Sequence, residues 1–544
     1  MFTDTWFNGS SAASQKSYDT LKSLNLGMVR FPSGDPSFWY RWDKPCGSVA
    51  APQEQCAEYL SPDDVTRYFT AGATSTGRAP LGGQTMFQIN TIHSWIEADG
   101  KTIWKTVCQK SEWQDPATGQ WLSSPIKDVN GRYLIDEASL QQAAAVAANW
   151  VRANRKLPTS QQAVYWEIGN EDWVRWTPEQ YARIVAVVGA KMIEANGKSV
   201  LANGTNAPLR LIAQTTTLAK DYTQLSSSSG DANNLAINQT AGVTFATRFA
   251  GQLQSNGLAP QKVYGVAAHP YLTGDRSPSI DTRTLTMFSK IDAANSEVQQ
   301  SIDALTTINK QLSTSWKALV TEYNVLEGLE TDTSGRTIPA QNKAHALILA
   351  DWTARMLSQG IEKVLPHNIE ADTRMGLFLY RNGYPISEPR LMAPSSAFAR
   401  LSTFLQGSLY RVDNNAPLVS YSNMAGATTS VRGLSNYAAV SADGLTLNVL
   451  LVNRNLYQSQ NVTLTFTGAK KFKTGGTLYS SSFGEANRLV DDNFTSNVTW
   501  TTPRSSGYTQ TCTLFSSPRT CTLKPSTPVT VPAGSIVHLQ VPLQ

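Results

Sequence analysis

The sequence predicts an α/β protein in which a (β/α)8 TIM barrel is followed by a C-terminal antiparallel β-sandwich. Over the first two thirds of the 544 residues, short apolar runs alternate with longer amphipathic runs. This alternation is typical of a parallel sheet with crossover helices. After about residue 395, alternating Val- and Thr-rich runs separated by Gly, Asn, Ser and Pro replace the helical periodicity. We therefore expect the barrel in residues 1–395 and the sandwich in residues 396–544.

The expected barrel strands are short apolar runs at residues 27–31, 85–90, 164–169, 209–213, 263–268, 318–322 and 363–367. Helical patterns lie between them, for example at residues 17–24, 140–154, 178–195, 298–312 and 343–359. An eighth strand would be residues 1–7 or a segment just before them, and eight strand–helix units close a barrel. The clearest sandwich strands are expected at residues 445–453, 462–466, 476–480 and 535–541.

Charge and composition exclude several classes of protein. The formal net charge of +5 is spread along the chain without a run of Lys or Arg, so nucleic acid is not an expected partner. No run of about 18 apolar residues is present, so no membrane-spanning helix is expected. The five His lack metal-binding spacing and no Cys-x-x-Cys occurs, so we predict no metal and no other cofactor. The oligomeric state is left open.

The five cysteines suggest an oxidising compartment. Cys46 and Cys56 flank a short loop-like segment, as do Cys512 and Cys521, and each pair is predicted to form a disulfide. Cys108 is left over and is expected to be a buried thiol. The residues after Met1 do not resemble a signal peptide, yet the disulfides favour a secreted or periplasmic protein. Five reduced thiols are the alternative interpretation.

Two apolar strands end in glutamates. The segment YWEIGNE ends at Glu171, and the segment ALVTEYN contains Glu322. Alternate residues of a strand share a face, so Glu167, Gly169 and Glu171 are expected to point into the barrel. Glu171 would lie at the carboxyl end of its strand, where the catalytic groups of this fold collect. Glu167 would lie deeper, and a buried carboxylate needs a partner, for which Arg30 is the candidate.

Two glutamates at the ends of different strands of one barrel can supply the pair of carboxyl groups that glycoside hydrolysis requires. One protonates the leaving oxygen and the other attacks the anomeric carbon, and a separation of about 5–5.5 Å gives retention through a covalent glycosyl-enzyme. We predict that Glu171 is the general acid/base and that Glu322 is the nucleophile. The alternative is that both are ordinary polar residues at strand ends.

The segments around these glutamates resemble clan A glycoside hydrolases. WEIGNE followed by TEYN is similar to that clan, whose acid/base Glu follows Asn on the fourth strand and whose nucleophile ends the seventh. The chain looks most similar to glycoside hydrolase family 51, which contains α-L-arabinofuranosidases and endoglucanases. VRFPSGDPSFWYRW, FQINT and AAHPYL resemble that family's Arg-x-Pro-Gly-Gly…Tyr-x-Trp, Asn-Gly-Thr and His-x-Tyr segments, with PSG and NTI as departures. There is also some resemblance to families 39 and 44.

The resemblance implies roles for further residues. Asn170 is expected to hydrogen-bond the sugar 2-hydroxyl, and Tyr271 is expected to hydrogen-bond Glu322 and hold it ionised. The other residues expected to bind substrate are His269, Asn90, Arg30, His367, Asn368 and Trp95. A barrel histidine with only a structural role is the alternative for His367.

Two long segments are expected to be loop insertions on the active-site face of the barrel, at residues 43–80 and about 94–133. The second contains Trp95, Trp104, Trp113 and Trp121. These rings either stack on sugar rings or pack the insertion internally.

The sequence thus predicts a retaining glycosidase that acts on a polysaccharide or oligosaccharide, with α-L-arabinofuranosidase as the preferred activity. An endo-β-1,4-glucanase or xylanase is the alternative, because Trp-rich insertions suit a cleft with several sugar subsites. A non-catalytic carbohydrate-binding protein is the alternative of another class, and the presence of both glutamates argues against it.

Overall fold

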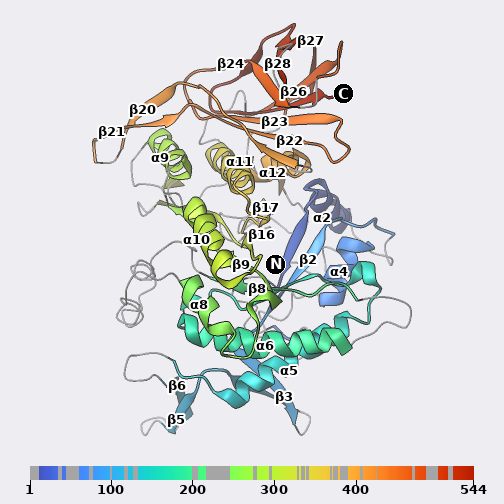
Figure 1. The fold of residues 1–544 in the computed structure, drawn as a ribbon, viewed down its shortest axis with the longest axis vertical. Helices are drawn as coiled ribbons and strands as arrows, with labels where there is room; N and C mark the ends of the chain where they lie inside the picture. Colours follow the sequence, from blue (N-terminus) through green and yellow to red (C-terminus); the bar gives the residue numbers. More distant parts are fainter. Residues whose placement is uncertain are drawn as a thin grey trace.

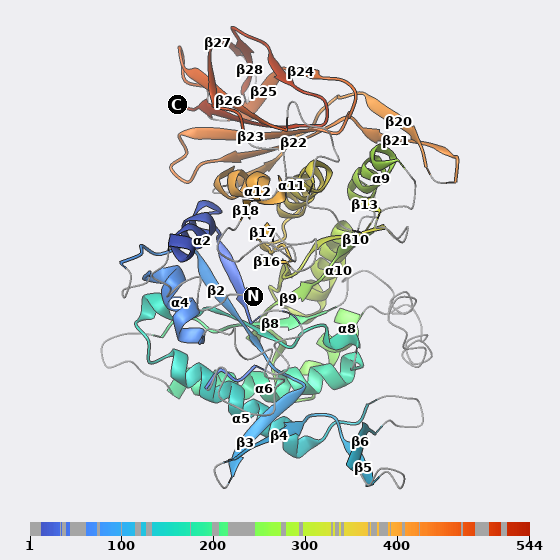
Figure 2. The ribbon, with the colours of Figure 1, turned by 180° about the vertical axis from the view of Figure 1, so that it is seen from behind.

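The computed structural model of the 544-residue chain contains a parallel sheet surrounded by helices and a separate antiparallel sheet (Figures 1 and 2). It describes residues 12–32, 34, 40–43, 61–72, 77–98, 101–114, 121–126, 133–174, 176–198, 206–215, 245–273, 279–292, 297–327, 330–331, 337–338, 342–367, 370–371, 378–379, 390–391, 393–404, 408–423, 425–468, 472–484, 500–512 and 519–544.

The parallel sheet has the strand order β1-β2-β7-β8-β9-β11-β15. Its strands are β1 (Met28–Phe31), β2 (Gln84–Ile89), β7 (Tyr165–Ile168), β8 (Arg210–Gln214), β9 (Val263–Ala268), β11 (Lys317–Val320) and β15 (Lys363–Val364). Each of the seven expected strands is therefore present, with bounds that differ by up to three residues, and neighbours in the sheet follow one another along the chain. The sheet curls as in a barrel. Closure by an eighth strand stays a prediction, because residues 1–7 lie outside the described residues.

Helices connect these strands and cover the sheet. They are α2 (Ala12–Ser23), α4 (Pro62–Thr70), α5 (Glu137–Asn154), α6 (Pro178–Lys198), α8 (Phe245–Leu253), α9 (Ile280–Asp292), α10 (Glu297–Leu312), α11 (Lys343–Ser358) and α12 (Ala393–Phe404). Side-chain caps begin several of them: Asp136 accepts a hydrogen bond from the Ser139 N–H before α5, and Asn342 accepts one from the His345 N–H before α11. Since α4 lies between β1 and β2, the expected insertion at residues 43–80 contains the crossover helix and is only in part a loop.

The segment expected as the second insertion forms two antiparallel hairpins. The first is β3 (His93–Ala98) with β4 (Lys101–Thr106), and the second is β5 (Lys110–Gln114) with β6 (Trp121–Pro125). Both views place these hairpins at the end of the molecule that is remote from the antiparallel sheet (Figures 1 and 2).

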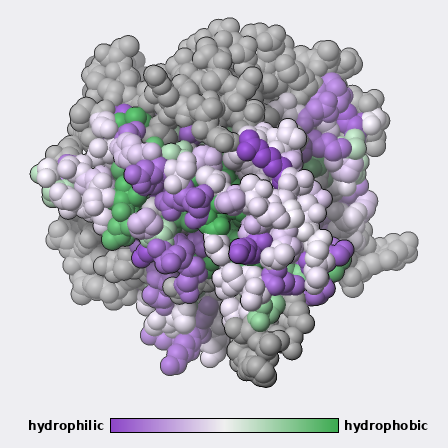
Figure 3. Space-filling view, turned by 90° about the horizontal axis from the view of Figure 1, so that it is seen from above, coloured by the Kyte–Doolittle hydropathy of each residue, from purple (hydrophilic) through white to green (hydrophobic). Residues whose placement is uncertain are grey.

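The C-terminal part is an eight-stranded antiparallel sheet with the order β19-β22-β23-β30-β26-β27-β28-β25 and two small strand pairs, β20-β21 and β24-β29. The bounds are β19 (Ser408–Arg411), β20 (Leu418–Ser422), β21 (Thr428–Arg432), β22 (Leu434–Val440), β23 (Thr446–Asn453), β24 (Gln460–Val462), β25 (Leu464–Gly468), β26 (Thr477–Phe483), β27 (Arg504–Cys512), β28 (Arg519–Pro525), β29 (Val529–Val531) and β30 (Ile536–Pro542). Seen from this end, the described residues are mostly hydrophilic or intermediate in hydropathy, with small hydrophobic patches (Figure 3).

Short strands complete the part of the chain that the structure describes. They are β10 (Tyr271–Thr273), β12 (Asn324–Glu327), β13 (Glu330–Thr331), β14 (Thr337–Ile338), β16 (Glu370–Ala371), β17 (Phe378–Leu379) and β18 (Arg390–Leu391). The β10 strand pairs in parallel with β12 just beyond β9 and β11. Among the described residues, no helix combines the length and apolar character needed to cross a membrane.

The helix α11 is buried along most of its length because it lies between the two sheets (Figure 1). One continuous hydrophobic core runs from the parallel sheet past Leu347 and Trp352 of α11 to Leu450 and Ile536 of the antiparallel sheet. Most of the buried residues of α11 are apolar, as expected for a helix that is enclosed on several sides.

The cysteine prediction holds where the structure describes it. Cys512 and Cys521 form a disulfide between β27 and β28, and Cys108 is a buried free thiol. Cys46 and Cys56 lie outside the described residues.

Candidate active site

The inner face of the parallel sheet changes from apolar to polar toward the carboxyl ends of its strands. Met86, Tyr165, Ile212, Ala267 and Leu319 form a small apolar layer inside the sheet. Because side chains alternate along a strand, the next inward position on β7 is Glu167, which is fully buried. The polar cluster therefore rests on an apolar layer, as in the interior of a barrel.

Arg30 on β1 is the centre of this cluster. Its Nε donates to Glu167 Oε2 and its Nη1 donates to Glu322 Oε1, while Nη2 donates to Asn170 Oδ1 at 3.0 Å. The pairing of Arg30 with Glu167 that the sequence suggested is confirmed. Glu167 accepts a further hydrogen bond from the Thr321 hydroxyl at 2.6 Å, so the deep carboxylate is paired on both oxygens.

Glu322 lies two residues beyond the end of β11 and is buried among hydrogen-bond donors. The Tyr271 hydroxyl donates to its Oε2 at 3.0 Å, which is the contact that the resemblance leads us to expect. His367 Nδ1 lies 3.2 Å from the same oxygen, and His269 Nδ1 lies 3.6 Å from it.

These neighbours control the charge of Glu322. Burial alone would raise the pKa of this carboxyl, but the charges of His269, Arg30 and His367 outweigh it and hold the pKa well below its ordinary value. The opposite holds for Tyr271, whose pKa is raised by burial and by the negative charges of Glu322 and Glu171. Glu322 is therefore an anion and Tyr271 a neutral hydrogen-bond donor.

Glu171 occupies a different environment. The strand β7 ends at Ile168, and the chain then turns through Gly169 (φ 89°) to Glu171 (φ 48°). Strand alternation therefore does not extend to Glu171, and the expectation that it shares a face with Glu167 by strand geometry is wrong. The turn still brings its carboxyl group, with 35% of the side chain exposed, to 3.2 Å from His269 Nδ1.

His269 lies between the two glutamates. Its Nδ1 faces Glu171 and Glu322, and its Nε2 lies 3.0 Å from the Thr321 hydroxyl oxygen. The Gln214 side-chain nitrogen lies 3.4 Å from the same ring atom, so both Gln214 and Thr321 hold the imidazole in place. The ring of Trp173 meets His269 edge-on, with centroids 5.3 Å apart.

One atom each of Glu171, His269 and Glu322 lie within 4.8 Å of one another. A carboxylate oxygen of Glu171 and one of Glu322 are therefore within that distance. The same cluster could accept a metal ion, but the Arg30 guanidinium already supplies a positive charge to Glu322 and occupies its Oε1.

Two other predicted site residues make structural contacts, and the rest are not described. The Asn90 side chain closes a turn by accepting from the N–H groups of Ile92 and His93. Trp95 is 5% exposed and its ring is covered by the Arg41 guanidinium, 5.1 Å from the ring centroid, so it presents no free face to a sugar. Asn368 and the side chains of Trp104, Trp113 and Trp121 lie outside the described residues.

Gln214 and Thr321 are site residues that the sequence analysis did not identify. Gln214 ends β8 and its Oε1 accepts a hydrogen bond from the Glu171 N–H, which fixes the turn that carries Glu171. Both residues follow apolar strands in the sequence, in LRLIAQ and ALVT. The rule that identified the two glutamates, a polar residue at the end of an apolar strand, would have found them as well.

No protein-family model and no curated protein sequence matches this chain. Solved structures do match it. A family 51 α-L-arabinofuranosidase from Bifidobacterium longum has a TM-score of 0.58 at 14% identity, over 98% of this chain and 91% of that one. A bifunctional glucanase-xylanase from a metagenome library has a TM-score of 0.54 at 15% identity, over 97% and 94%. A family 44 xyloglucanase from Paenibacillus polymyxa has a TM-score of 0.51 at 11% identity, over 95% and 94%.

These matches cover nearly the whole length of both chains, so this chain has the fold of glycoside hydrolases. The expected resemblance to family 51, with some resemblance to family 44, is confirmed at the level of the fold.

Proposed function

We propose that this protein is a retaining glycoside hydrolase in which Glu322 is the nucleophile and Glu171 the general acid/base. The observation that carries the proposal is the pair of carboxylates, with an oxygen of each within 4.8 Å of the other. Retaining enzymes hold these groups about 5–5.5 Å apart, whereas inverting enzymes need about 6.5–9.5 Å to admit a water molecule.

The two carboxyl groups are suited to different roles. Glu322 is buried and held ionised by Arg30, His269 and His367, as a nucleophile must be. Glu171 is partly exposed, as a group that exchanges protons with the leaving group and with water must be.

The reaction then follows in two steps. Glu171 gives its proton to the glycosidic oxygen while a Glu322 oxygen attacks the anomeric carbon, which releases the leaving sugar and forms a glycosyl ester on Glu322. Glu171, now ionised, takes a proton from a water molecule that attacks the same carbon and frees Glu322. Tyr271 stabilises the Glu322 carboxylate between turnovers by its hydrogen bond. Arg30 holds the Asn170 side chain, which forms a hydrogen bond with the sugar 2-hydroxyl.

Within this class we propose an α-L-arabinofuranosidase, supported by the sequence segments that resemble family 51 and by the family 51 enzymes among the structural matches. An endo-β-1,4-glucanase or xylanase is the second candidate, supported by the matched bifunctional glucanase-xylanase. Product analysis on arabinan, arabinoxylan, xylan, β-glucan and cellulose separates them. Arabinose as the only product supports the first candidate, and a ladder of oligosaccharides supports the second.

The two glutamates are tested by substitution. We expect Glu171→Ala and Glu322→Ala each to lower kcat/KM on an aryl glycoside by about a thousandfold or more, through loss of proton transfer and of the covalent path. Azide should restore turnover to one of the variants, because a small anion can replace the missing carboxylate. Near-native turnover by either variant would overturn the assignment, and loss of activity in a chelator would point to a metal at the Glu171–His269–Glu322 cluster.

We further propose that residues 1–395 are the catalytic part and residues 396–544 a β-sandwich domain. The Cys512–Cys521 disulfide supports a secreted or periplasmic location. A non-catalytic carbohydrate-binding protein would bind the same polysaccharides and show no turnover in the wild-type chain.

A further inference from the structure

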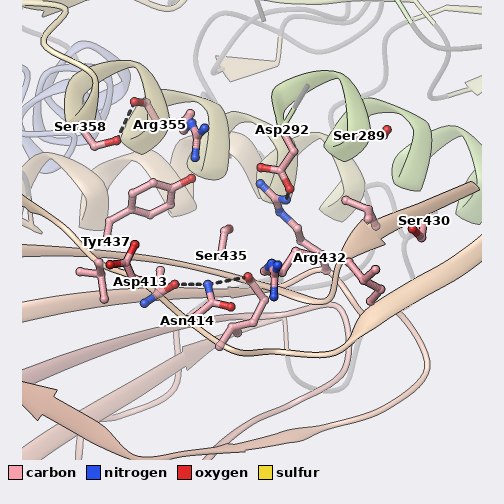
Figure 4. Close-up of a pocket in the computed structure, with 16 residues that line it drawn as sticks. Ser289, Asp292, Arg355, Ser358, Asp413, Asn414, Ser430, Arg432, Ser435 and Tyr437 are labelled. Carbon is pink, nitrogen blue, oxygen red and sulfur yellow. Dashed lines mark hydrogen bonds and ion pairs between the residues drawn. The ribbon is translucent and has the colours of Figure 1, made fainter. Parts of the chain in front are cut away.

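A second cavity lies where the helices of the catalytic part meet the antiparallel sheet (Figure 4). It has a volume of about 540 Å³, and it shares no lining residue with the glutamate site. One wall comes from α9 and α11, and the other from β20, β21, β22 and the segment before β20. Its size is within the range of about 300–1,000 Å³ that is usual for small-molecule sites.

The cavity contains an arginine side chain with one buried donor that is not satisfied among the described residues. Arg355 projects from α11 toward Tyr437 on β22 (Figure 4). Its Nε is buried, and within the described ranges it makes no hydrogen bond. A buried donor without an acceptor is costly, so this position favours a ligand that brings an acceptor.

The opposite wall carries a second guanidinium group. Arg432, at the end of β21, donates one hydrogen bond through Nη1 to the Ala416 carbonyl at 2.9 Å. Arg454 is also in the lining and pairs with Asp292 and Asp351. The lining itself therefore contains three guanidinium groups, of Arg355, Arg432 and Arg454, and two carboxylates, of Asp292 and Asp413.

The rest of the lining matches a sugar ring better than a small inorganic anion. The Ser430 hydroxyl and the Asn436 side-chain nitrogen can pair with sugar hydroxyls, and Leu418, 60% exposed, offers an apolar surface. A single phosphate or sulfate would leave most of this volume unfilled.

We propose that this cavity is a second saccharide site that binds an acidic sugar unit, with the carboxylate of a uronic acid held between Arg355 and Arg432. Planar guanidinium groups recognise carboxylates through paired, charge-assisted hydrogen bonds. The choice of a saccharide rests on the proposed function of the glutamate site. The cavity would hold a charged side branch of the polysaccharide whose main chain or other branches are cleaved at Glu322.

The test is a binding measurement that needs no turnover. The Glu322→Gln variant is titrated by calorimetry with xylotetraose that carries one glucuronic acid and, separately, with unsubstituted xylotetraose. We expect Arg355→Gln, added to this background, to weaken binding of the acidic sugar about tenfold or more and to leave binding of the neutral sugar unchanged. The matched control is Arg152→Gln, which removes a guanidinium from the exposed face of α5 and should change neither affinity.

Three results would overturn the proposal. The first is that the acidic sugar binds Glu322→Gln equally well with and without Arg355→Gln. The second is that Arg355→Gln weakens the binding of both sugars equally. The third is that an equal concentration of inorganic phosphate displaces the acidic sugar. Since Arg355 contacts neither glutamate, Arg355→Gln in the otherwise native chain should keep its kcat/KM on a small aryl glycoside. Binding stays measurable even if Glu322 is not the nucleophile, so the failure of one proposal is distinguishable from the failure of the other.

Discussion

The charge of Glu322 is set by residues from four different strands or strand ends. Arg30 comes from β1, His269 and Tyr271 from the end of β9 and the start of β10, and His367 from beyond β15. A single glutamate in an apolar strand would be neutral or would be excluded from the interior. The surrounding donors explain how it is both buried and ionised.

This arrangement predicts the acid side of the pH profile. A carboxyl group with a lowered folded-state pKa remains ionised below about pH 4.3, the ordinary value for Glu. It stabilises the fold above its unfolded-state pKa, and this contribution is lost as the pH falls through the folded-state pKa. His367→Gln removes one of the charges that lower this pKa, so the acid limb of kcat/KM should move to higher pH. His93→Gln is the control, and an unmoved limb in the His367 variant would contradict the assignment.

Single residues were the part of the site that the sequence predicted best. Glu171, Glu322, Arg30, Tyr271 and His269 meet in one cluster. All five stand at or beside the ends of apolar runs, where a strand pattern predicts a shared edge of the sheet. For Trp95 we expected a contact with substrate, but its ring is covered by the Arg41 guanidinium. The periodicity of the sequence does not predict a contact of this kind.

At the scale of elements, the turn after β7 determines where Glu171 lies. Gly169 has φ 89°, and a Cβ at this position would lie 1.6 Å from Asp172 Oδ2. Asp172 accepts from the Thr91 hydroxyl at 2.8 Å, so it is not free to move away. The turn is therefore restricted to glycine, both by its backbone conformation and by its neighbour.

We expect Gly169→Ala to displace Glu171 and to lower kcat by about a hundredfold, since a shift of about 1 Å at a catalytic group has this effect. An alanine in this left-handed backbone conformation strains the folded state, which should lower the free energy of unfolding by about 1–2 kcal/mol. Gly197→Ala in α6 is the matched control, because its Cβ would have nothing within 4 Å, and it should be neutral or stabilising. Steady-state kinetics and urea unfolding measure both effects, and a fully active Gly169→Ala would show that the turn does not position Glu171.

The order of the strands and helices was largely predictable from the sequence, but a short helix and a turn were not. The apolar runs predicted the strands of the parallel sheet, because a strand buried on both faces has a nearly continuous apolar sequence. The helix α4 was missed because it is short and lies in a segment rich in polar residues, although Ser61 and Pro62 are a usual helix start. The turn at Gly169 was missed because the strand alternation was extended through Gly169 to Glu171, although a glycine at the end of an apolar run is a turn signal.

At the scale of the whole molecule, buried charges join the antiparallel sheet to the helices. Arg454, just after β23, pairs with Asp292 at the end of α9 and with Asp351 in α11. Asp351 also accepts from the Ser435 and Tyr437 hydroxyls of β22. Together with the continuous core across α11, this network packs the C-terminal sheet against the helices that cover the parallel sheet.

Asp351→Ala should therefore destabilise the whole chain. Without Asp351, the buried Arg454 is left with Asp292, of whose side chain 29% is exposed, and the Ser435 and Tyr437 hydroxyls lose their acceptor, which together should cost about 3–5 kcal/mol. Asp351→Ala with Arg454→Met should recover part of this loss, because the buried guanidinium is then absent and Asp292, with 29% of its side chain exposed, can be hydrated. Urea unfolding followed by fluorescence gives both values, and a single variant within about 1 kcal/mol of the native chain would show that the network does not hold the two parts together.

The measurement that tests the central claim most directly is the trapping of the glycosyl-enzyme. A 2-deoxy-2-fluoro glycoside with a good leaving group slows both steps, because fluorine removes the hydrogen bonds of the 2-hydroxyl and opposes positive charge at the anomeric carbon. With an activated leaving group, the ester forms faster than water removes it. We predict that digestion and mass spectrometry will find one sugar bound to the peptide that contains Glu322, and none on this peptide in Glu322→Gln. A label on a different carboxylate, or inactivation without any covalent adduct, would contradict the account.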